Sequence, residues 1–394
     1  MAFLVSPGVE IKEVDATNVI PAVSSSIGGF AGSFNWGPTE EVVLVSSENE
    51  LAEKFGSPDD NTAKYFLTAA SFLKYGNALK VVRASSGHLN ATHLGNGQLV
   101  KNEDDYDNNH STGISGKGNW VAKYPGVLGN SIQVSMVTAG VSTSNYNAWT
   151  FKGSFAEKPG TSDFAKGLGK TSAADELHVA VVDRLGAISG TPNTVLETFE
   201  FLSQGSDAKK ADGTTNFYKE VINSQSEWIY WANHDSSLTD AGETVASQAG
   251  AMTTNTAVID NNLSGGTDDN APTTGELALA YDKFEDAETV DVNLLFAVPD
   301  ANGANTIAND LIAIATARKD CMAFVSPPLE DSVGSSSPST DVIAFADTLT
   351  SSSYASCDSG ALYVYDKYND VFRYIGAAGH IAGLCANTDN VADA

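Results

Sequence analysis

The fold is decided by residues 290–325, which read VDVNLLFAVPDANGANTIANDLIAIATARKDCMAFV. The apolar run at 290–298 predicts a buried strand, Asn305–Arg318 has the length and composition of a helix, and Cys321–Val325 predicts a second strand. A strand, a helix and a strand in this order are typical of two parallel strands joined by a crossover helix. We therefore expect an α/β layer in this part of the chain.

The segments on either side extend this layer. Thr273 or Thr274 can cap a helix that runs through Phe284, which makes the order α-β-α-β. Closer to the N-terminus, the small and apolar residues of Ser26–Phe34 predict a buried strand whose glycines permit close packing. The elements expected after it are a strand at 41–45, a helix at 48–55, a helix capped by Asn61 and stopped by Gly76, and a strand at Leu79–Ala84.

The remainder of the chain is less regular. The segment 85–119 is rich in Gly, Asn, Asp, His and Ser and carries an acidic tract at 103–107, so we expect an insert or a long loop. The further elements expected are strands near 131–138 and 177–183, an aromatic strand at 228–231, a seam between domains around 235–269, a helix at 341–349, a strand from 362 toward 374 and a helix at 377–386.

Charge limits the partners of the chain. Its 394 residues contain 22 Lys and Arg but 49 Asp and Glu, which gives a formal net charge of −27. Nucleic-acid binding needs clustered cations, and the longest basic cluster is Lys209-Lys210, between Asp207 and Asp212. No run approaches about 18 apolar residues, and residues 1–8 lack the basic segment of a signal peptide. We expect no nucleic-acid binding, no membrane insertion and no general secretion.

The motifs of common enzymes are missing from the sequence. It contains no phosphate-binding GxxxxGK[ST] loop, no GxSxG nucleophile elbow and no HExxH pair. Its three cysteines lie far apart and suit buried free thiols. His88, His93 and His110 share the insert with the acidic tract, but a solvated loop explains them better than a metal site, because hard cations need a folded cage of oxygen ligands. We expect a protein that is not an enzyme, with no cofactor and no metal.

A dense charged and aromatic stretch lies near the C-terminus. Residues 365–374 read YDKYNDVFRY, and no base or nucleophile accompanies the carboxylates, so catalysis is a poor interpretation. A salt-bridged turn between strands, or a patch at an interface, explains the stretch better. The residues expected in such a patch are Tyr365, Asp366, Tyr368, Asp370 and Arg373.

A second candidate segment opens the chain. Residues Val9–Asp15, VEIKEVD, alternate apolar and polar side chains at their start and predict an extended strand after Pro7-Gly8. The next expected strand lies far along the sequence, so the pattern leaves the pairing partner of this strand open.

Several strings along the chain together resemble the contractile tail sheath proteins of bacteriophages. Each string is weak by itself, but their order across almost the whole chain is specific. The strings are SPGVEIKE at 6–13, FNWGP at 34–38, FLKYGN at 72–77, LKVVRA at 79–84, YPGVLGN at 124–130, LSGG at 263–266, RKDC at 318–321, SPP at 326–328, YDKYND at 365–370 and IAGLCANTDN at 381–390.

The resemblance implies a structural subunit without catalytic activity. Copies of such a subunit form stacked rings or a helix around a tail tube in the virion tail, and they contract to drive the tube through the host envelope. It also implies contacts with the tail tube, baseplate and tail terminator proteins, and assembly in the host cytoplasm. The alternative function, from a different class, is an acidic surface or adhesin-type binding module.

The resemblance further implies terminal arms that add strands to the sheets of neighbouring copies. By position and pattern the N-terminal arm is the segment of Val9, Glu10, Ile11, Lys12, Glu13, Val14 and Asp15. We then expect a multidomain α+β and α/β fold, with mixed sheets flanked by helices and an extended N-terminal arm strand. Its parts are an arm at 1–22, a discontinuous middle domain at 23–84 plus 120–250, a short insert or reduced protruding domain at 85–119, and an α/β sheath domain at 251–394. We expect the C-terminal domain of the family to be absent from this chain.

Overall fold

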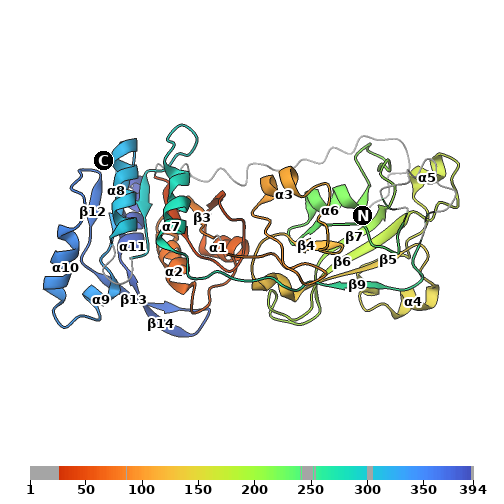
Figure 1. The fold of residues 1–394 in the computed structure, drawn as a ribbon, viewed down its shortest axis with the longest axis horizontal. Helices are drawn as coiled ribbons and strands as arrows, with labels where there is room; N and C mark the ends of the chain where they lie inside the picture. Colours follow the sequence, from red (N-terminus) through yellow and green to blue (C-terminus); the bar gives the residue numbers. More distant parts are fainter. Residues whose placement is uncertain are drawn as a thin grey trace.

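The computed structural model describes residues 26–85, 87–239, 241, 252, 254–299 and 305–391. Figure 1 shows an elongated molecule with two lobes along its length. The first lobe combines residues 26–85 with residues 274–391, and the second lobe is formed by the segment between them. The predicted arm strand, Val9–Asp15, lies outside the described residues.

The first lobe is built on a six-stranded sheet with the order β12-β11-β10-β1-β3-β2. All neighbouring strands are parallel except β2 and β3. The strands are β1 (Gly28–Gly32), β2 (Val42–Val45), β3 (Leu79–Arg83), β10 (Leu294–Phe296), β11 (Met322–Val325) and β12 (Ala355–Cys357). Residues 290–325 thus form β10, helix α8 (Thr306–Arg318) and β11, and the two strands are adjacent and parallel as predicted.

Helices cover both faces of this sheet because its inner strands are apolar on both sides. Phe30 and Val81 point toward helices α2 (Ala63–Leu73) and α11 (Ala378–Val391). Ala31 and Val82 point toward α7 (Thr274–Tyr281) and α8 on the opposite face. The other helices of this lobe are α1 (Glu48–Phe55), the 3₁₀ turn η4 (Asp282–Phe284), α9 (Leu329–Ser332) and α10 (Pro338–Asp347).

Two local predictions about the first lobe are confirmed. A side-chain carbon placed on Gly28 would lie 2.7 Å from Cζ of Phe72, so the glycines of β1 are needed where α2 packs closely on the sheet. Thr273 caps α7 and forms a capping box with Glu276.

The predicted cap of α2 is wrong. The residue before the helix is Thr62, not Asn61, and its side chain makes no capping hydrogen bond. Asp59 instead accepts hydrogen bonds from the amides of Asn61 and Thr62, at 3.0 and 2.9 Å. The carboxylate of Asp59 reaches both amides at once, so it organises the turn that precedes the helix.

The second lobe is centred on an antiparallel sheet with the order β7-β6-β5-β9. A two-stranded ladder of β4 and β8 packs beside it in one hydrophobic core. The strands are β4 (Trp120–Ala122), β5 (Ile132–Thr138), β6 (Glu176–Asp183), β7 (Thr194–Ser203), β8 (Ile229–Trp231) and β9 (Ile259–Asn262). The helices and 3₁₀ turns are α3 (Glu103–Asn109), η2 (Val127–Ser131), α4 (Thr143–Ala148), η3 (Lys152–Ser154), α5 (Asp163–Gly167) and α6 (Tyr218–Gln225).

The strand pairing corrects the grouping expected from the sequence. Strands β1 and β3, from the segment 23–84, pair with each other and with β10, so they belong to the same sheet as residues 294–357 and not to the sheet of 120–250. Strand β9, from the segment 251–394, pairs instead with β5 of the second lobe. The β1–β10 and β5–β9 pairs join residues more than 100 positions apart, and no local pattern specifies which distant strand is the partner.

The segment 85–119 is also more ordered than a solvated loop. Its acidic tract forms α3, which Asn102 caps. Tyr106 is buried, its ring lies 4.1 Å from that of Tyr230, and its hydroxyl donates to the carbonyl of Trp231 at 2.6 Å. Together with Ala91, which lies in the core of the second lobe, this buried aromatic side chain ties the segment to that lobe.

Candidate interface on the β13–β14 hairpin

The candidate patch lies on a hairpin at one side of the first lobe. Strands β13 (Ala361–Asp366) and β14 (Val371–Gly376) form a two-stranded antiparallel sheet, joined by a turn at 367–370. Tyr363 stands opposite Tyr374, and Tyr365 stands opposite Phe372, so these four side chains share one face. The intervening residues Val364 and Ile375 point to the other face and pack in the core of the lobe.

Asp366 holds the turn together. Its buried carboxylate accepts hydrogen bonds from the amide of Tyr368 at 3.0 Å, the side chain of Asn369 at 2.8 Å and Nε of Arg373 at 2.9 Å. Burial alone would raise the pKa of Asp366, but these hydrogen bonds outweigh it and hold the pKa below its usual value. Asp366 is therefore an ionised structural anchor.

Residues of the turn and of β14 also fix the hairpin to α2 and to the residues that precede α2. Arg373 forms an ion pair with Asp60 in addition to Asp366, and the side chain of Asn369 donates to the carbonyl of Pro58 at 3.1 Å. The ring of Tyr368 packs edge-on against Phe66 of α2, with centroids 5.2 Å apart. Of the five predicted patch residues, Asp366, Tyr368 and Arg373 thus act inward.

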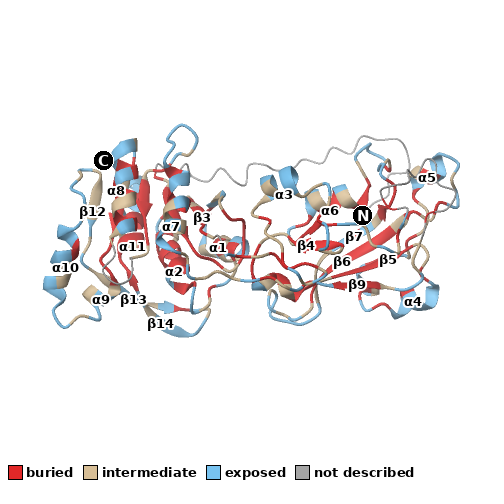
Figure 2. Cartoon of the chain, in the orientation of Figure 1, coloured by how far each residue is buried: buried red, intermediate tan, exposed pale blue. Residues whose placement is uncertain are grey.

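The outward side carries four aromatic rings, Tyr363, Tyr365, Phe372 and Tyr374, which we call the aromatic face. These residues are 59%, 51%, 53% and 46% exposed. Neighbouring ring centroids lie 4.5 to 5.2 Å apart, so the rings form one continuous surface. Figure 2 shows β14 largely exposed, in contrast to the buried strands of the second lobe. With about 150–250 Å² per aromatic side chain, half of it exposed, the face offers roughly 400 Å², the size of surface patches that often have a function.

Sequence reasoning located the hairpin but missed most of this face. Among the predicted patch residues, Tyr365 and Asp370 lie at the surface, where the hydroxyl of Tyr365 donates to Asp370 at 2.7 Å. Tyr363, Phe372 and Tyr374 were not predicted. The alternation of Tyr363 and Tyr365 before the turn, and of Phe372 and Tyr374 after it, is the signal that indicates one face of a hairpin.

Several strings that carried the family resemblance meet at the junction of the two lobes. Trp36, from FNWGP, stacks on Trp228 with ring centroids 5.6 Å apart and lies edge-on to Tyr124, from YPGVLGN, at 5.5 Å. Although Trp36 follows the first strand of the first lobe, it is buried in the core of the second. The junction is therefore packed like an interior.

Arg83, from LKVVRA, is the polar centre of this junction. It is fully buried, and Nη1 donates to the carbonyl of Gly37 and to the carbonyl of Pro125, both at 2.8 Å. Burial lowers the pKa of Arg83 to about 9, while the charge of Asp268 acts in the opposite direction. One guanidinium group thus connects a turn of the first lobe to a turn of the second.

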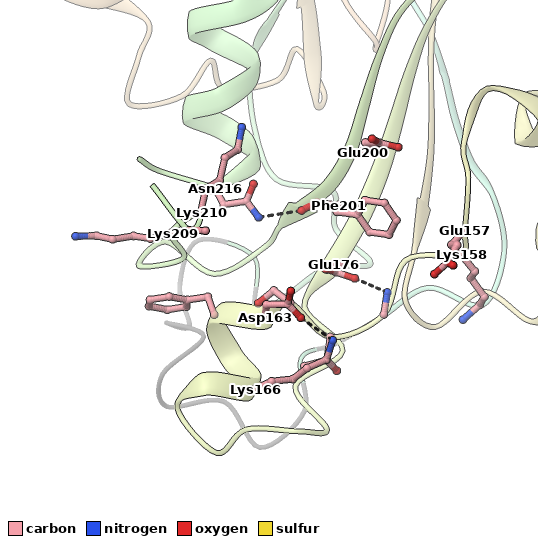
Figure 3. Close-up of a pocket in the computed structure, with 15 residues that line it drawn as sticks. Glu157, Lys158, Asp163, Lys166, Glu176, Glu200, Phe201, Lys209, Lys210 and Asn216 are labelled. Atoms are coloured by element: carbon pink, nitrogen blue, oxygen red, sulfur yellow. Dashed lines mark hydrogen bonds and ion pairs between the residues drawn. The ribbon is translucent and has the colours of Figure 1, made fainter. Parts of the chain in front are cut away.

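A hollow of about 1010 Å³ lies at the far end of the second lobe, beside α5. Its walls include four lysines: Lys158, Lys166, Lys209 and Lys210 (Figure 3). Lys158 donates to the carbonyl of Ala139 at 2.6 Å, and Lys166 pairs with Asp163 at 3.0 Å. Lys209 and Lys210 lie on an exposed turn.

The histidines of the insert do not converge on a metal site. Burial, assisted by the charge of Arg83, lowers the pKa of His88 to about 3, so this side chain is neutral at ordinary pH. In the part of the chain that the structure describes, no group of three or more His, Cys, Asp or Glu side chains is placed to hold a metal ion. Among the same residues, no helix combines the length and apolar character of a membrane span.

The described residues thus form a two-lobed fold with an exposed aromatic hairpin on the first lobe. Residues 26–84, which span β1 to β3, match the family model described as Tail sheath protein Gp18 domain III N-terminal region. The tail sheath protein of Salmonella phage ViI is 27% identical over 99% of this chain and 71% of its own length. That of Enterobacteria phage T4 is 28% identical over 98% of this chain and 73% of its own length.

Over nearly its whole length the chain is therefore similar to tail sheath proteins of bacteriophages. A solved sheath tail protein from Listeria innocua is also similar, with a TM-score of 0.48 and 12% identity over 92% of this chain. This chain spans 56% of the length of that structure.

Proposed function

We propose that copies of this chain polymerise around a tail tube as stacked rings or a helix, and that contraction of this polymer drives the tube through the host envelope. The observation that carries the proposal is the match to curated tail sheath proteins over 98–99% of the chain. The acidic surface or adhesin-type module is not favoured, since the curated matches are to tail sheath proteins. The role is structural rather than enzymatic.

The polymer is a component of the virion tail, and it assembles in the host cytoplasm. Its partners are further copies of this chain, the tail tube protein, and the baseplate and tail terminator proteins at the two ends of the tail. Because identical copies must associate without closing on themselves, the contacts between them are heterologous: each copy uses two different surfaces.

Two segments are proposed as contact surfaces between copies. The first is Val9–Asp15, whose main-chain groups would pair with the sheet of a neighbour and so link copies while their bodies rotate. The second is the hairpin, where Tyr365 and Asp370 lie beside the other rings of the aromatic face. Asp366, Tyr368 and Arg373 contribute by fixing the position of the hairpin.

Deletion of residues 1–15 tests the first surface. We expect the shortened protein to remain folded, because the core residues of both lobes lie between 30 and 386, and to form no linked sheaths. Negative-stain electron microscopy reads the assembly, and circular dichroism reads the fold. Sheaths of normal length from the deleted protein would show that the arm is not a link between copies.

A further inference from the structure

The aromatic face has no partner within the described chain, and its charged surroundings limit what can cover it. The hairpin and the side chains paired to it contain four acidic residues, Asp366, Asp370, Asp60 and Glu48, and two basic ones, Lys367 and Arg373. Both basic side chains are already paired. Asp366 is buried and points inward, so the carboxylate beside the rings at the surface is that of Asp370, and the hairpin with its paired side chains carries an excess of negative charge.

This charge pattern disfavours two identical hairpins face to face, because their excess negative charges would repel each other. It favours a partner that brings cations. An ammonium group above a tyrosine or phenylalanine ring is attracted by the negative face of the ring, and nearby carboxylates add to the attraction. The chemistry of the partner is therefore a lysine- or arginine-bearing projection.

The chain itself carries such a projection. Lys209 and Lys210 are adjacent and exposed on a tight turn, in which the amide of Lys210 donates to the carbonyl of Thr214 at 2.9 Å and the amide of Gly213 donates back at 3.0 Å. Figure 3 shows the side chain of Lys209 extending away from the body of the lobe. The other adjacent basic pair of the sequence is Arg318-Lys319, whose arginine is buried and paired with Asp320 at 2.9 Å.

The two surfaces lie on different lobes. The hairpin belongs to the first lobe, and Lys209 and Lys210 lie beside α5, at the far end of the second lobe in Figure 1. One copy cannot bring its own lysine turn to its own hairpin without taking the lobes apart. Between copies the contact uses a different surface on each side, and a contact of this kind repeats into an open chain.

We propose that the aromatic face of one copy binds the Lys209-Lys210 turn of a second copy. The contact is head to tail, with the lysine ammonium groups over the rings and beside Asp370. This inference rests on the proposed function, because it names one of the contacts through which copies of the chain associate.

A mixing experiment tests the contact without requiring a complete sheath. One variant, K209Q/K210Q, loses the cationic turn, and a second, Y363S/F372S, loses half of the aromatic face. We expect each variant alone to self-associate about tenfold more weakly than the unchanged protein, as two exposed cation–π contacts imply. An equimolar mixture should associate more strongly than either variant alone, because each variant keeps the surface that the other has lost. Sedimentation velocity, with one variant fluorescently labelled, measures the self-association of each variant and the association in the mixture.

Matched controls separate this contact from general effects of charge and apolar exposure. K283Q/K319Q removes the same number of exposed positive charges from the first lobe, and L279S/L384S removes exposed apolar side chains from α7 and α11. Both should associate like the unchanged protein. Circular dichroism checks that every variant is folded, and K209R/K210R, which keeps the charges, should restore association.

Carbodiimide cross-linking of assembled protein, mixed from ¹⁴N and ¹⁵N material, gives a second readout. We expect an isotopically mixed cross-link between Lys209 or Lys210 and Asp370. The inference is overturned if the lysine variant and the hairpin variant associate normally, or if the lysine turn cross-links only to other segments. Tubes that form with the lysine pair cross-linked elsewhere would overturn this contact alone, whereas a folded protein that never forms tubes would overturn the proposed function.

Discussion

Replacing Asp366 by alanine should release the hairpin from α2, whereas the same change at Asp60 should leave it in place. Both carboxylates bind Arg373, but Asp366 is buried and the side chain of Asp60 is 85% exposed. Asp366 also accepts hydrogen bonds from the amide of Tyr368 and the side chain of Asn369. The pair of variants therefore compares a buried and an exposed partner of one arginine.

The expected magnitudes differ clearly. A hydrogen bond that involves a charged group contributes about 1.5–3 kcal/mol and a neutral one about 1 kcal/mol, and removing one partner of a buried ion pair costs about 3–5 kcal/mol. The cost of removing Asp366 is smaller than the sum of these values, because Arg373 keeps its ion pair with Asp60 and its freed donors lie near water. We expect Asp366→Ala to lower the free energy of unfolding by about 3 kcal/mol, and Asp60→Ala by less than about 1 kcal/mol, as for an exposed pair.

Urea unfolding followed by circular dichroism measures the global change, and amide hydrogen exchange of residues 361–376 measures local opening of the hairpin. The exchange of these amides should accelerate in Asp366→Ala and stay unchanged in Asp60→Ala. Equal destabilisation by the two substitutions, or no change in either, would contradict the assignment of Asp366 as the anchor of the hairpin.

Three further predictions concern the junction, pH and salt. Arg83→Met, which keeps the unbranched apolar stem but removes the guanidinium group that donates to the carbonyls of Gly37 and Pro125, should destabilise the protein by about 2 kcal/mol in urea unfolding; unchanged stability would mean that Arg83 does not connect the lobes. Burial lowers the pKa of His88 from 6.5 to about 3, so the unfolded chain binds a proton that the folded chain does not. The contribution of neutral His88 to the free energy of unfolding is complete above pH 6.5. It is lost as the pH falls from 6.5 toward 3, with a slope of at most about 1.4 kcal/mol per pH unit. Comparing the free energy of unfolding of the unchanged protein with that of His88→Gln across this range isolates the contribution of the histidine. Because copies with a net charge of −27 repel each other, assembly followed by light scattering should depend on salt, and equal polymerisation from very low to high ionic strength would contradict the electrostatic account.

Local patterns in the sequence predicted much of the first lobe. The strand, helix and strand of residues 290–325 are recognisable because a central parallel strand is apolar throughout and its crossover helix has an ordinary length. The capping box at Thr273 follows from the chemistry of its own four residues. Features of this kind depend on neighbours in the chain, so a single sequence is enough to predict them.

Pairing between distant segments could not be predicted. Strand β1 pairs with β10 so that Gly28 lies beside Leu294. Both faces of each strand are apolar, so no pattern of side chains selects one partner strand over another. The segment 85–119 looks solvated because most of its residues are polar, yet buried side chains such as Ala91 and Tyr106 tie it to the second lobe. In the hairpin, the salt-bridged turn between strands expected from Asp366 and Arg373 is present, but the sequence did not show that this pair would be turned inward and that aromatic rings would lie outside.

Electron cryomicroscopy of the assembled polymer tests most directly whether this chain is a sheath subunit whose copies hold one another. Density should show tubes in which residues 9–15 of each copy complete a sheet of another copy, and in which the aromatic face of the hairpin is covered by a neighbour. Particles without tubular order, or tubes in which residues 9–15 fold back on their own copy and the hairpin faces solvent, would contradict the account.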